Sequence, residues 1–292
     1  MKVSKFNKGI VSSTIGSFWW GFLGTFYFQF VTFAGTLEVV VHRCIWTALL
    51  LFISTLFFNK WNLFVKIIKN KKNLIFLFIT SILIFGNWSV WIYAVTSEKI
   101  IDASFGYFIF PIISVLLGSF FFKEKLNKLR ITSIIIVILS SIYLLLDLKS
   151  FPYVGFIVAI LWSTYNLIRK KINIETDIGL FIESLFILPF ALLIFYFIYI
   201  NNLNDFSISK PSIMLLLMLA GPMTVIPLFL YVKGVQLSGL GPSGMIFFVT
   251  PTGQFILGYF YYNEPFSHHK FYSFILIWIA VFIYLKDLYE KN

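Results

Sequence analysis

The chain has 292 residues, of which 59% are hydrophobic, 21% aromatic and only 12% charged. A soluble domain is about 45–50% apolar and about a quarter charged, and a disordered chain is less hydrophobic still, so both classes are excluded. Too few polar residues remain to cover a core that would bury 37 Phe, 15 Tyr and 8 Trp. The composition therefore predicts a protein whose solvent is lipid. A single cysteine, Cys44, excludes a disulfide framework.

Ten apolar segments are long enough to cross a bilayer as helices, which takes about 20 residues. They are residues 10–31, 38–58, 74–96, 101–122, 131–147, 152–169, 178–200, 212–233, 241–262 and 271–286. Several are apolar on every face, unlike the alternating strands of a lipid-facing barrel. The sequence therefore predicts an all-α membrane protein with ten transmembrane helices. The first segment is too long for the core of a signal peptide and lacks a cleavage site, so we expect it to be retained.

The distribution of Lys and Arg predicts the orientation in the membrane. With the N-terminus inside, 18 of the 23 Lys and Arg residues fall on the inner side, and five fall outside: Arg43, Lys99, Lys149, Lys210 and Lys270. Cytoplasmic loops of membrane proteins carry this excess. We therefore interpret the net charge of +11 as an orientation signal rather than a nucleic-acid surface, and expect both termini in the cytoplasm.

The two halves of the chain are similar to each other at an offset of 140 residues. This register aligns Pro111 with Pro251, Gly118 with Gly258, Phe120 with Phe260 and Glu124 with Glu264. A slightly larger offset aligns Trp20 with Trp162 and Glu38 with Glu183. Five spans per half is an odd number, so the second half must enter the membrane in the opposite orientation. The sequence thus predicts two inverted five-helix repeats, residues 8–147 and 152–286, as in secondary transporters.

Longer motifs point to a family. They are Glu38-Val-Val-Val-His42-Arg43-Cys-Ile-Trp46, Asn87-Trp88, Ala103-Ser104-Phe-Gly106-Tyr107-Phe108 with Pro111, Gly179-Leu180 with Glu183, Ile226-Pro227-Leu228, Pro251-Thr-Gly-Gln254-Phe255 and Glu264-Pro265-Phe266. From about residue 8 to residue 286 the chain resembles the drug/metabolite transporter superfamily with two EamA-type repeats, and within it the chloramphenicol-sensitivity (RarD) subgroup.

This resemblance implies ten helices in inverted EamA repeats, a place in the bacterial cytoplasmic (inner) membrane, and the carriage of a small organic solute, either a metabolite or a drug-like molecule. The chain departs from the subgroup at Tyr93 and Phe110, where Trp and Asn are usual. The lost Asn removes an amide from an expected cavity wall, which leaves open a different substrate.

Polar and aromatic residues within the predicted spans suggest a substrate cavity. A largely apolar pocket with a few placed polar groups suits a small molecule, and ring faces attract cations. The predicted cavity residues are Trp20, Asn87, Trp91, Ser104, Tyr107, Trp162, Asn166 and Gln254. The alternative is that these aromatic residues form ordinary packing or interfacial belts.

Three prolines are candidates for moving parts of the protein. Pro111 and Pro251 fall at matched positions in the middle of predicted spans, where a proline removes a backbone hydrogen bond and kinks the helix. Together with Pro227 they are predicted to be gating or hinge positions. Simple packing is the alternative.

Four ionisable side chains fall within the predicted spans: Glu38, His42, Arg43 and Glu183. Each costs at least ~2.5–3.5 kcal/mol at the centre of a bilayer, so each is a functional candidate. Three interpretations of the first three residues stay open. They form a solvated group at the outer interface, with Arg43 reaching headgroups; they hold the helix against a neighbour or gate the outer mouth; or His42 couples transport to protons. Glu183 is expected to pair with a basic residue such as Arg169, or to contact substrate.

These features predict a secondary transporter, working as an exporter, that moves a small organic solute by alternating access. We expect no cofactor and no metal, and no nucleic acid among its partners, which are the substrate, the lipid bilayer and a proton or counter-solute. The chain has no phosphate-binding loop, so ATP is not the expected energy source. The oligomeric state is open between monomer and homodimer. Two alternatives remain: an intramembrane enzyme with Glu38 and His42 as its acid–base pair, and a non-transporting membrane subunit.

Overall fold

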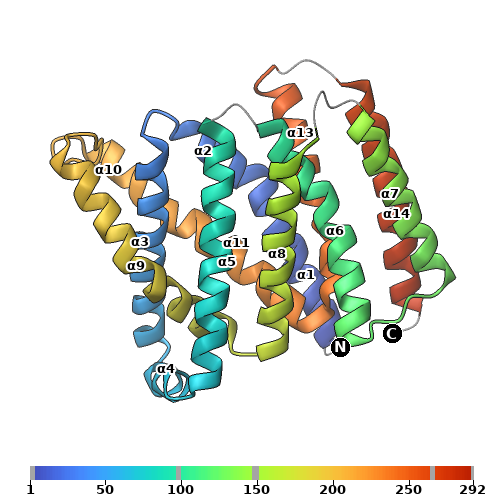
Figure 1. The fold of residues 1–292 in the computed structure, drawn as a ribbon, viewed down its shortest axis with the longest axis horizontal. Coiled ribbons are helices and arrows are strands. Elements are labelled where there is room, and N and C mark those ends of the chain that lie inside the picture. Colours follow the sequence, from blue (N-terminus) through green and yellow to red (C-terminus); the bar gives the residue numbers. More distant parts are fainter. Residues whose placement is uncertain (1–3, 97–99, 147–150, 264–266, 291–292) are drawn as a thin grey trace.

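The computed structural model of the chain describes residues 4–96, 100–146, 151–263 and 267–290. All regular structure in these ranges is helical, and the helices stand side by side in one bundle (Figure 1). They are α1 (Lys5–Phe18), the π-helix η1 (Trp19–Gly24), α2 (Thr25–Phe30), α3 (Thr36–Phe57), α4 (Trp61–Ile68), α5 (Lys71–Thr96), α6 (Ile100–Phe122), α7 (Lys128–Leu146), α8 (Tyr153–Ile172), α9 (Thr176–Ile200), α10 (Pro211–Met218), α11 (Ala220–Ser238), α12 (Leu240–Ile246), α13 (Val249–Phe260) and α14 (His268–Glu290). The all-α prediction is confirmed.

Seven helical segments within these ranges are long and apolar enough to cross a membrane. They are α3, Lys71–Trp91 of α5, Phe105–Phe122 of α6, α7, α9, the segment Pro211–Ser238 formed by α10 and α11, and α14. Each coincides with a predicted span. The other three predicted spans fall on less regular or more polar helices: η1 interrupts the first, α8 ends in three basic residues, and the ninth is divided between α12 and α13.

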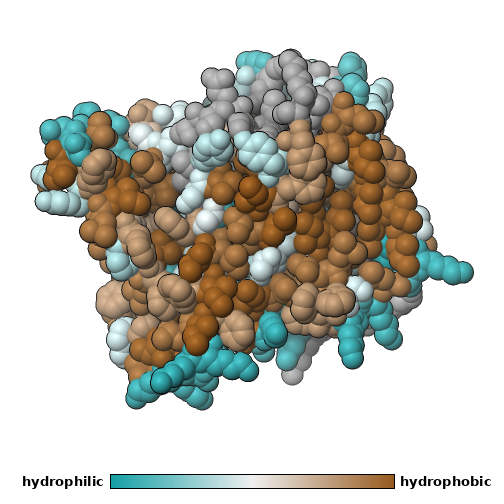
Figure 2. Space-filling model, in the orientation of Figure 1, coloured by the Kyte–Doolittle hydropathy of each residue, from teal (hydrophilic) through white to brown (hydrophobic). Residues whose placement is uncertain are grey.

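The outer surface of the bundle is apolar over most of its height. Large side chains are exposed on the outward faces of several helices, including Ile53, Ile82, Leu139 and Phe282. Figure 2 shows a broad apolar band across one face of the molecule, with polar residues gathered at its ends. A contiguous apolar surface of this extent is typical of contact with lipid, so the chain is a multi-pass membrane protein.

The two ends of the bundle differ in charge. The first and last described residues lie at the same end, which we call the termini end; it also carries α4 (Figure 1). The turns and helix ends at the termini end carry most of the described basic residues, namely Lys5, Lys8, Lys60, Lys66, Lys69, Lys71, Lys72, Lys123, Lys125, Lys128, Arg130, Arg169, Lys170, Lys171, Lys233 and Lys286. The opposite end holds α2, α10 and the connections 31–35 and 201–210.

Helices from the two halves of the chain interlock. α3 packs on α9, α6 on α12 and α7 on α14, and the members of each pair run in opposite directions (Figure 1). α1 packs on α11 in the same way that α8 packs on α5. Because most large interfaces join one half to the other, neither half encloses a core alone.

Cysteine labelling should report the orientation of these two ends. In a Cys44→Ser background, which removes a cysteine that is itself buried, we expect Ser209→Cys to react with a membrane-impermeant maleimide in intact cells. Asn62→Cys, on exposed α4 at the termini end, should react only after the membrane is permeabilised. Labelling of both cysteines from the same side would contradict the arrangement of the bundle across the membrane.

Candidate substrate cavity

A cavity of about 360 Å³ lies between α2, α3, α5, α6, α8, α11 and α13. It is lined by Trp20, Gly24, Thr25, Phe28, Gln29, Val31, Thr32, Ala34, Thr36, Val39, Val40, Arg43, Ile84, Asn87, Trp88, Trp91, Tyr107, Trp162, Thr224, Leu228, Phe247, Thr250 and Gln254. Most of these residues belong to the halves of their helices that are remote from the termini end, and the connection after α2 supplies several. The cavity therefore reaches the opposite end of the bundle.

Five rings close the deep side of the cavity, and we call them the aromatic floor: Trp20, Phe110, Trp162, Tyr231 and Phe247. Their centroids are 4.8–6.4 Å apart. Phe110 and Tyr231 are fully buried and follow the lining residues of α6 and α11 toward the termini end. The Tyr231 hydroxyl donates to the carbonyl of Ser243 at 3.0 Å, which holds its ring in place.

Six of the eight residues predicted to form the cavity line it: Trp20, Asn87, Trp91, Tyr107, Trp162 and Gln254. Asn166 does not. Its side chain is fully buried, and its amide donates to the Trp162 carbonyl one turn earlier, so the group is directed along its own helix. The side chain of Ser104 lies outside the described residues. Glu264, the predicted counterpart of Glu124, lies outside them as well.

Several residues that line the cavity cannot be identified from the sequence. Phe28, Thr224 and Phe247 carried no signal that separated them from other apolar or small polar positions in the spans. Gln29 did carry one, because an amide inside an apolar run is unusual, and it lines the cavity near the mouth.

Arg43 lines the cavity instead of reaching toward headgroups, which corrects the interfacial interpretation of this residue. Its Nε donates to the Thr224 hydroxyl at 3.0 Å. Its guanidinium carbon lies 4.7 Å from the ring centroid of Phe28 and 4.8 Å from that of Trp88. Aromatic faces thus surround the charge, and cation–π attraction stabilises it there.

Glu38 is buried, so the interpretation of a solvated group at the interface is wrong for this residue too. Both carboxylate oxygens accept hydrogen bonds of 2.9 Å from the backbone N–H of Asp205, and one also accepts from Phe206. The carboxylate therefore binds the start of α3 to the connection between α9 and α10. His42 lies beside it, with Nε2 3.7 Å from Glu38, and accepts from Trp46 Nε1 through Nδ1 at 3.0 Å.

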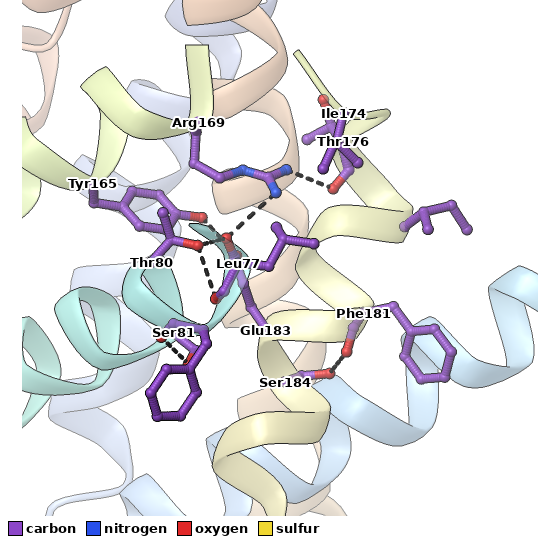
Figure 3. A network of polar contacts seen from close by, with 12 residues as sticks. Leu77, Thr80, Ser81, Tyr165, Arg169, Ile174, Thr176, Phe181, Glu183 and Ser184 are labelled. Atoms are coloured by element: carbon purple, nitrogen blue, oxygen red, sulfur yellow. Dashed lines mark hydrogen bonds and ion pairs between the residues drawn. The ribbon is translucent and has the colours of Figure 1, made fainter. Parts of the chain in front are cut away.

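Glu183 joins three helices in the half of the bundle nearer the termini end, and Figure 3 shows its polar contacts. Its carboxylate accepts hydrogen bonds from Thr80 of α5 at 2.5 Å and from Tyr165 of α8 at 3.0 Å. The Arg169 guanidinium lies 3.3 Å away, so the expected partner is the one found. Arg169 also donates to the Thr176 carbonyl at 3.1 Å. Both charged side chains are buried, which makes this a desolvated ion pair.

Glu124 closes the termini end below the aromatic floor. It follows α6, and its oxygens accept from the backbone N–H groups of Leu240 and Gly241, each at 2.9 Å, at the start of α12. Lys170 of α8 lies 2.7 Å from the same carboxylate. Gly239 makes the sharp turn between α11 and α12 with a φ of +108°, a conformation that favours glycine. Three helices therefore converge on one carboxylate.

The interrupted first span allows the chain to approach α13 closely. A Cβ on Gly21 of η1 would lie 2.8 Å from the carbonyl oxygen of Thr250, so only glycine fits at this contact. The adjacent Trp20 can then place its ring in the aromatic floor. π-helical turns inside α-helices are frequent at functional sites.

The prolines occupy unequal positions. Pro111 lies inside the continuous helix α6 and Pro227 inside α11. Pro251 instead lies in the first turn of α13. Just before it, the backbone N–H groups of Phe247 and Phe248 donate to carbonyls three residues earlier, and the Thr250 N–H donates to the Phe247 carbonyl at 2.8 Å. A proline is tolerated in a first turn because its missing N–H has no helical acceptor there. The two prolines therefore differ in local setting: the interruption of the ninth span directly precedes Pro251, whereas Pro111 lies in an unbroken helix.

Comparisons with known proteins agree with this fold. The EamA-like transporter family model matches residues 7–146. Uncharacterized transporter YojE of Bacillus subtilis (strain 168) is 32% identical over 97% of this chain and 95% of that protein. Protein RarD of Escherichia coli (strain K12) is 27% identical over 98% of this chain and 97% of that protein. A solved crystal structure has the same fold, with a TM-score of 0.68 at 12% identity over 96% of this chain and 97% of that one.

The helical bundle, its lipid-facing surface and these relatives define a membrane transporter. The chain belongs to the EamA-type drug/metabolite transporters, in the RarD subgroup.

Removing the Glu183 carboxylate should destabilise the bundle severely. Glu183→Gln leaves the Arg169 charge buried without an anion, which costs about 3–5 kcal/mol in proteins. We expect a marked fall in the melting temperature of the purified protein, partly reversed in the double variant Glu183→Gln/Arg169→Met. Glu175→Gln is the control, because Glu175 forms an exposed pair with Lys60 and such pairs contribute little. A melting temperature unchanged by Glu183→Gln would contradict the role given to this ion pair.

Proposed function

We propose that the protein is a secondary transporter that moves a small organic solute across the bacterial cytoplasmic membrane by alternating access, and that it works as an exporter. The observation that carries the proposal is a cavity that reaches one end of the bundle and is closed toward the other. A binding site open to one side at a time is what alternating access requires.

Two layers of contacts close the termini end in this conformation. The aromatic floor lies directly beneath the cavity, and beyond it Glu124 binds Lys170 and the first N–H groups of α12. Opening this end means breaking the contacts of Glu124 and separating the rings. Both layers join helices from different halves of the chain, so a movement of one half relative to the other would open them together.

The packing of the helices supports two inverted repeats. If each helix of the first half is exchanged for its counterpart in the second, the α3–α9, α6–α12 and α7–α14 interfaces map onto themselves. The same exchange maps the α1–α11 interface onto the α8–α5 interface. The antiparallel direction of the first three pairs fits an inversion (Figure 1). Such pseudo-symmetry supplies two nearly equivalent conformations.

The concentration of Lys and Arg at the termini end supports an orientation with both termini in the cytoplasm. In that orientation the cavity faces the outside, and the conformation is the one from which an exporter releases its solute. The enzyme alternative loses support, because neither Glu38 nor His42 lines the cavity and both Glu38 oxygens already accept backbone N–H groups.

Flux measurements test the proposal. Purified protein in liposomes should exchange or release members of a panel of radiolabelled metabolites without altering them chemically, driven by a solute or proton gradient. Thermal-shift screening of the same panel selects the compounds to test, because a bound ligand raises apparent stability. Chemical conversion of a compound would support the enzyme alternative, and an absence of flux for every compound that binds would contradict transport.

Weakening the closed end should make the cavity accessible from the cytoplasmic side. In a Cys44→Ser/Gln254→Cys background, we expect Glu124→Gln to increase modification of the cavity cysteine from the termini side, because a neutral amide loses the Lys170 ion pair and one of its two acceptor oxygens. Glu290→Gln is a matched control, since Glu290 forms an exposed pair with Lys286 at the same end. Equal modification rates in both variants would contradict a gate at Glu124.

The two aligned prolines should have unequal effects on transport. Pro111→Ala restores a donor inside continuous α6, so we expect it to straighten the helix and change the flux and the accessibility of the cavity cysteine. Pro251→Ala adds a donor in a first turn, where no helical acceptor is available, so both quantities should stay close to those of the unmodified protein. A larger effect of Pro251→Ala than of Pro111→Ala would contradict the assignment of Pro111 as the hinge.

A further inference from the structure

The charge of the cavity comes from one side chain. Among the described residues that line it, Arg43 alone carries a formal charge, and no carboxylate is present in that lining. The rest of the described wall is mostly aromatic and aliphatic, with neutral polar groups that are the amides of Gln29, Asn87 and Gln254 and the hydroxyls of Thr25, Thr32, Thr36, Thr224, Thr250 and Tyr107.

Arg43 differs from the other two arginines of the chain in its partners. Arg130 binds Asp287 at 2.8 Å, and Arg169 lies 3.3 Å from Glu183. Arg43 makes no ion pair with any described residue. Its one hydrogen bond uses Nε, so both terminal nitrogens keep their donors within this part of the protein. A guanidinium has five N–H donors in a fork that matches a carboxylate, and four of them are free here.

An unpaired cation in an apolar wall attracts anions strongly. Water screens charges poorly inside a narrow, low-dielectric cavity, so the field of Arg43 is weakened less than it would be at a surface. One positive charge neutralises one negative charge, so a dianion would keep an uncompensated charge in the cavity. A cation would face repulsion from Arg43, and none of the described lining residues has a carboxylate to offset it.

The rings next to Arg43 define the rest of the ligand. Trp88 touches the guanidinium, and beyond it Trp91 lies 5.4 Å from Tyr107, which lies 5.6 Å from Phe247 of the aromatic floor. Ring faces therefore extend from the charged wall down to the floor. The volume of about 360 Å³ is at the small end of ligand cavities, which suits a molecule of one or two rings.

We propose that this cavity selects small organic monoanions, with the carboxylate on the free N–H donors of Arg43 and an apolar, ring-bearing body on the aromatic residues. The inference rests on the proposed transport function only in naming the bound molecule as the substrate. It replaces the cationic substrate that the aromatic residues alone suggested, because the charge in the wall has the same sign as such a substrate.

A matched series of three probes tests the charge preference directly: 3-phenylpropanoate, the neutral 3-phenylpropanamide and the cationic 3-phenylpropylamine. Dissociation constants are measured by calorimetry on the purified full chain in lipid nanodiscs. We expect the carboxylate to bind at least about tenfold more tightly than the amide, and the amine to bind more weakly still. Equal or tighter binding of the amide or the amine, or no binding of any probe to folded protein, overturns the proposal.

Substitutions then assign the preference to Arg43. Arg43→Gln should weaken the carboxylate to the level of the amide and leave the amide unchanged, and Arg43→Lys should keep the order of the probes with a smaller difference. Lys210→Gln is the control, because it removes one positive charge from an exposed site outside the cavity. An Arg43→Gln protein that still prefers the carboxylate overturns the assignment. If that variant does not fold, the comparison of the three probes on the unmodified chain remains decisive.

The same probes separate this inference from transport itself. Selective binding of the carboxylate without flux in liposomes would contradict the transport proposal and support the charge preference. Flux of neutral or cationic solutes with no preference for anions would support transport and overturn the charge preference.

Discussion

A polar group inside a membrane must find its partner within the protein, because lipid offers none. This requirement explains the partners of three buried or half-buried carboxylates. Glu38 binds the backbone of residues 205 and 206, Glu124 binds the start of α12 and Lys170, and Glu183 binds Thr80, Tyr165 and Arg169. Each of the three joins the first half of the chain to the second. The costly desolvation of these groups is therefore offset by contacts that also fix how the halves are docked.

The same requirement separates Arg43 from the other buried charges. An ion pair with Glu183 compensates the charge of Arg169, whereas aromatic faces and one hydroxyl stabilise Arg43 and leave donors directed to the cavity. Cation–π contacts contribute of order 1 kcal/mol, less than a desolvated charge needs, and no carboxylate of the described residues pairs with Arg43, so water or a ligand in the cavity would add compensation. Stability and binding are thus linked at this residue, whereas at Glu183 the ion pair is complete without a ligand.

Sequence reasoning predicts the helical class and the apolar spans, and six of the eight residues that it assigns to the cavity do line it, because hydropathy and residue type carry that information locally. Such prediction fails where the group that binds a side chain is distant from it in the sequence. Nothing in the sequence near Glu38 indicates that the backbone of Asp205, 167 residues later, binds its carboxylate, so the local sequence is equally compatible with a solvated carboxylate. The prediction for Asn166 fails for a different reason. A side-chain amide in a helix can donate to a backbone carbonyl of its own helix, and only the fold determines whether the amide is directed there or into the cavity. The alignment of Pro111 with Pro251 does not show that one lies inside a continuous helix and the other in a first turn, because an alignment does not show where each helix begins.

Irregular backbone in this protein is concentrated beside the cavity. The π-helix η1 supplies Trp20, the turn between α12 and α13 supplies Phe247, and the two segments touch where Gly21 meets the carbonyl of Thr250. Non-helical backbone at membrane depth is tolerated where protein covers it or where it lines a cavity, and these segments meet both conditions. Their hydrogen bonds are already altered, so a change of conformation there breaks fewer ideal helical bonds than a bend in α3 or α9 would. Because both segments carry rings of the aromatic floor, movement at this contact would couple the shape of the cavity directly to the closure beneath it.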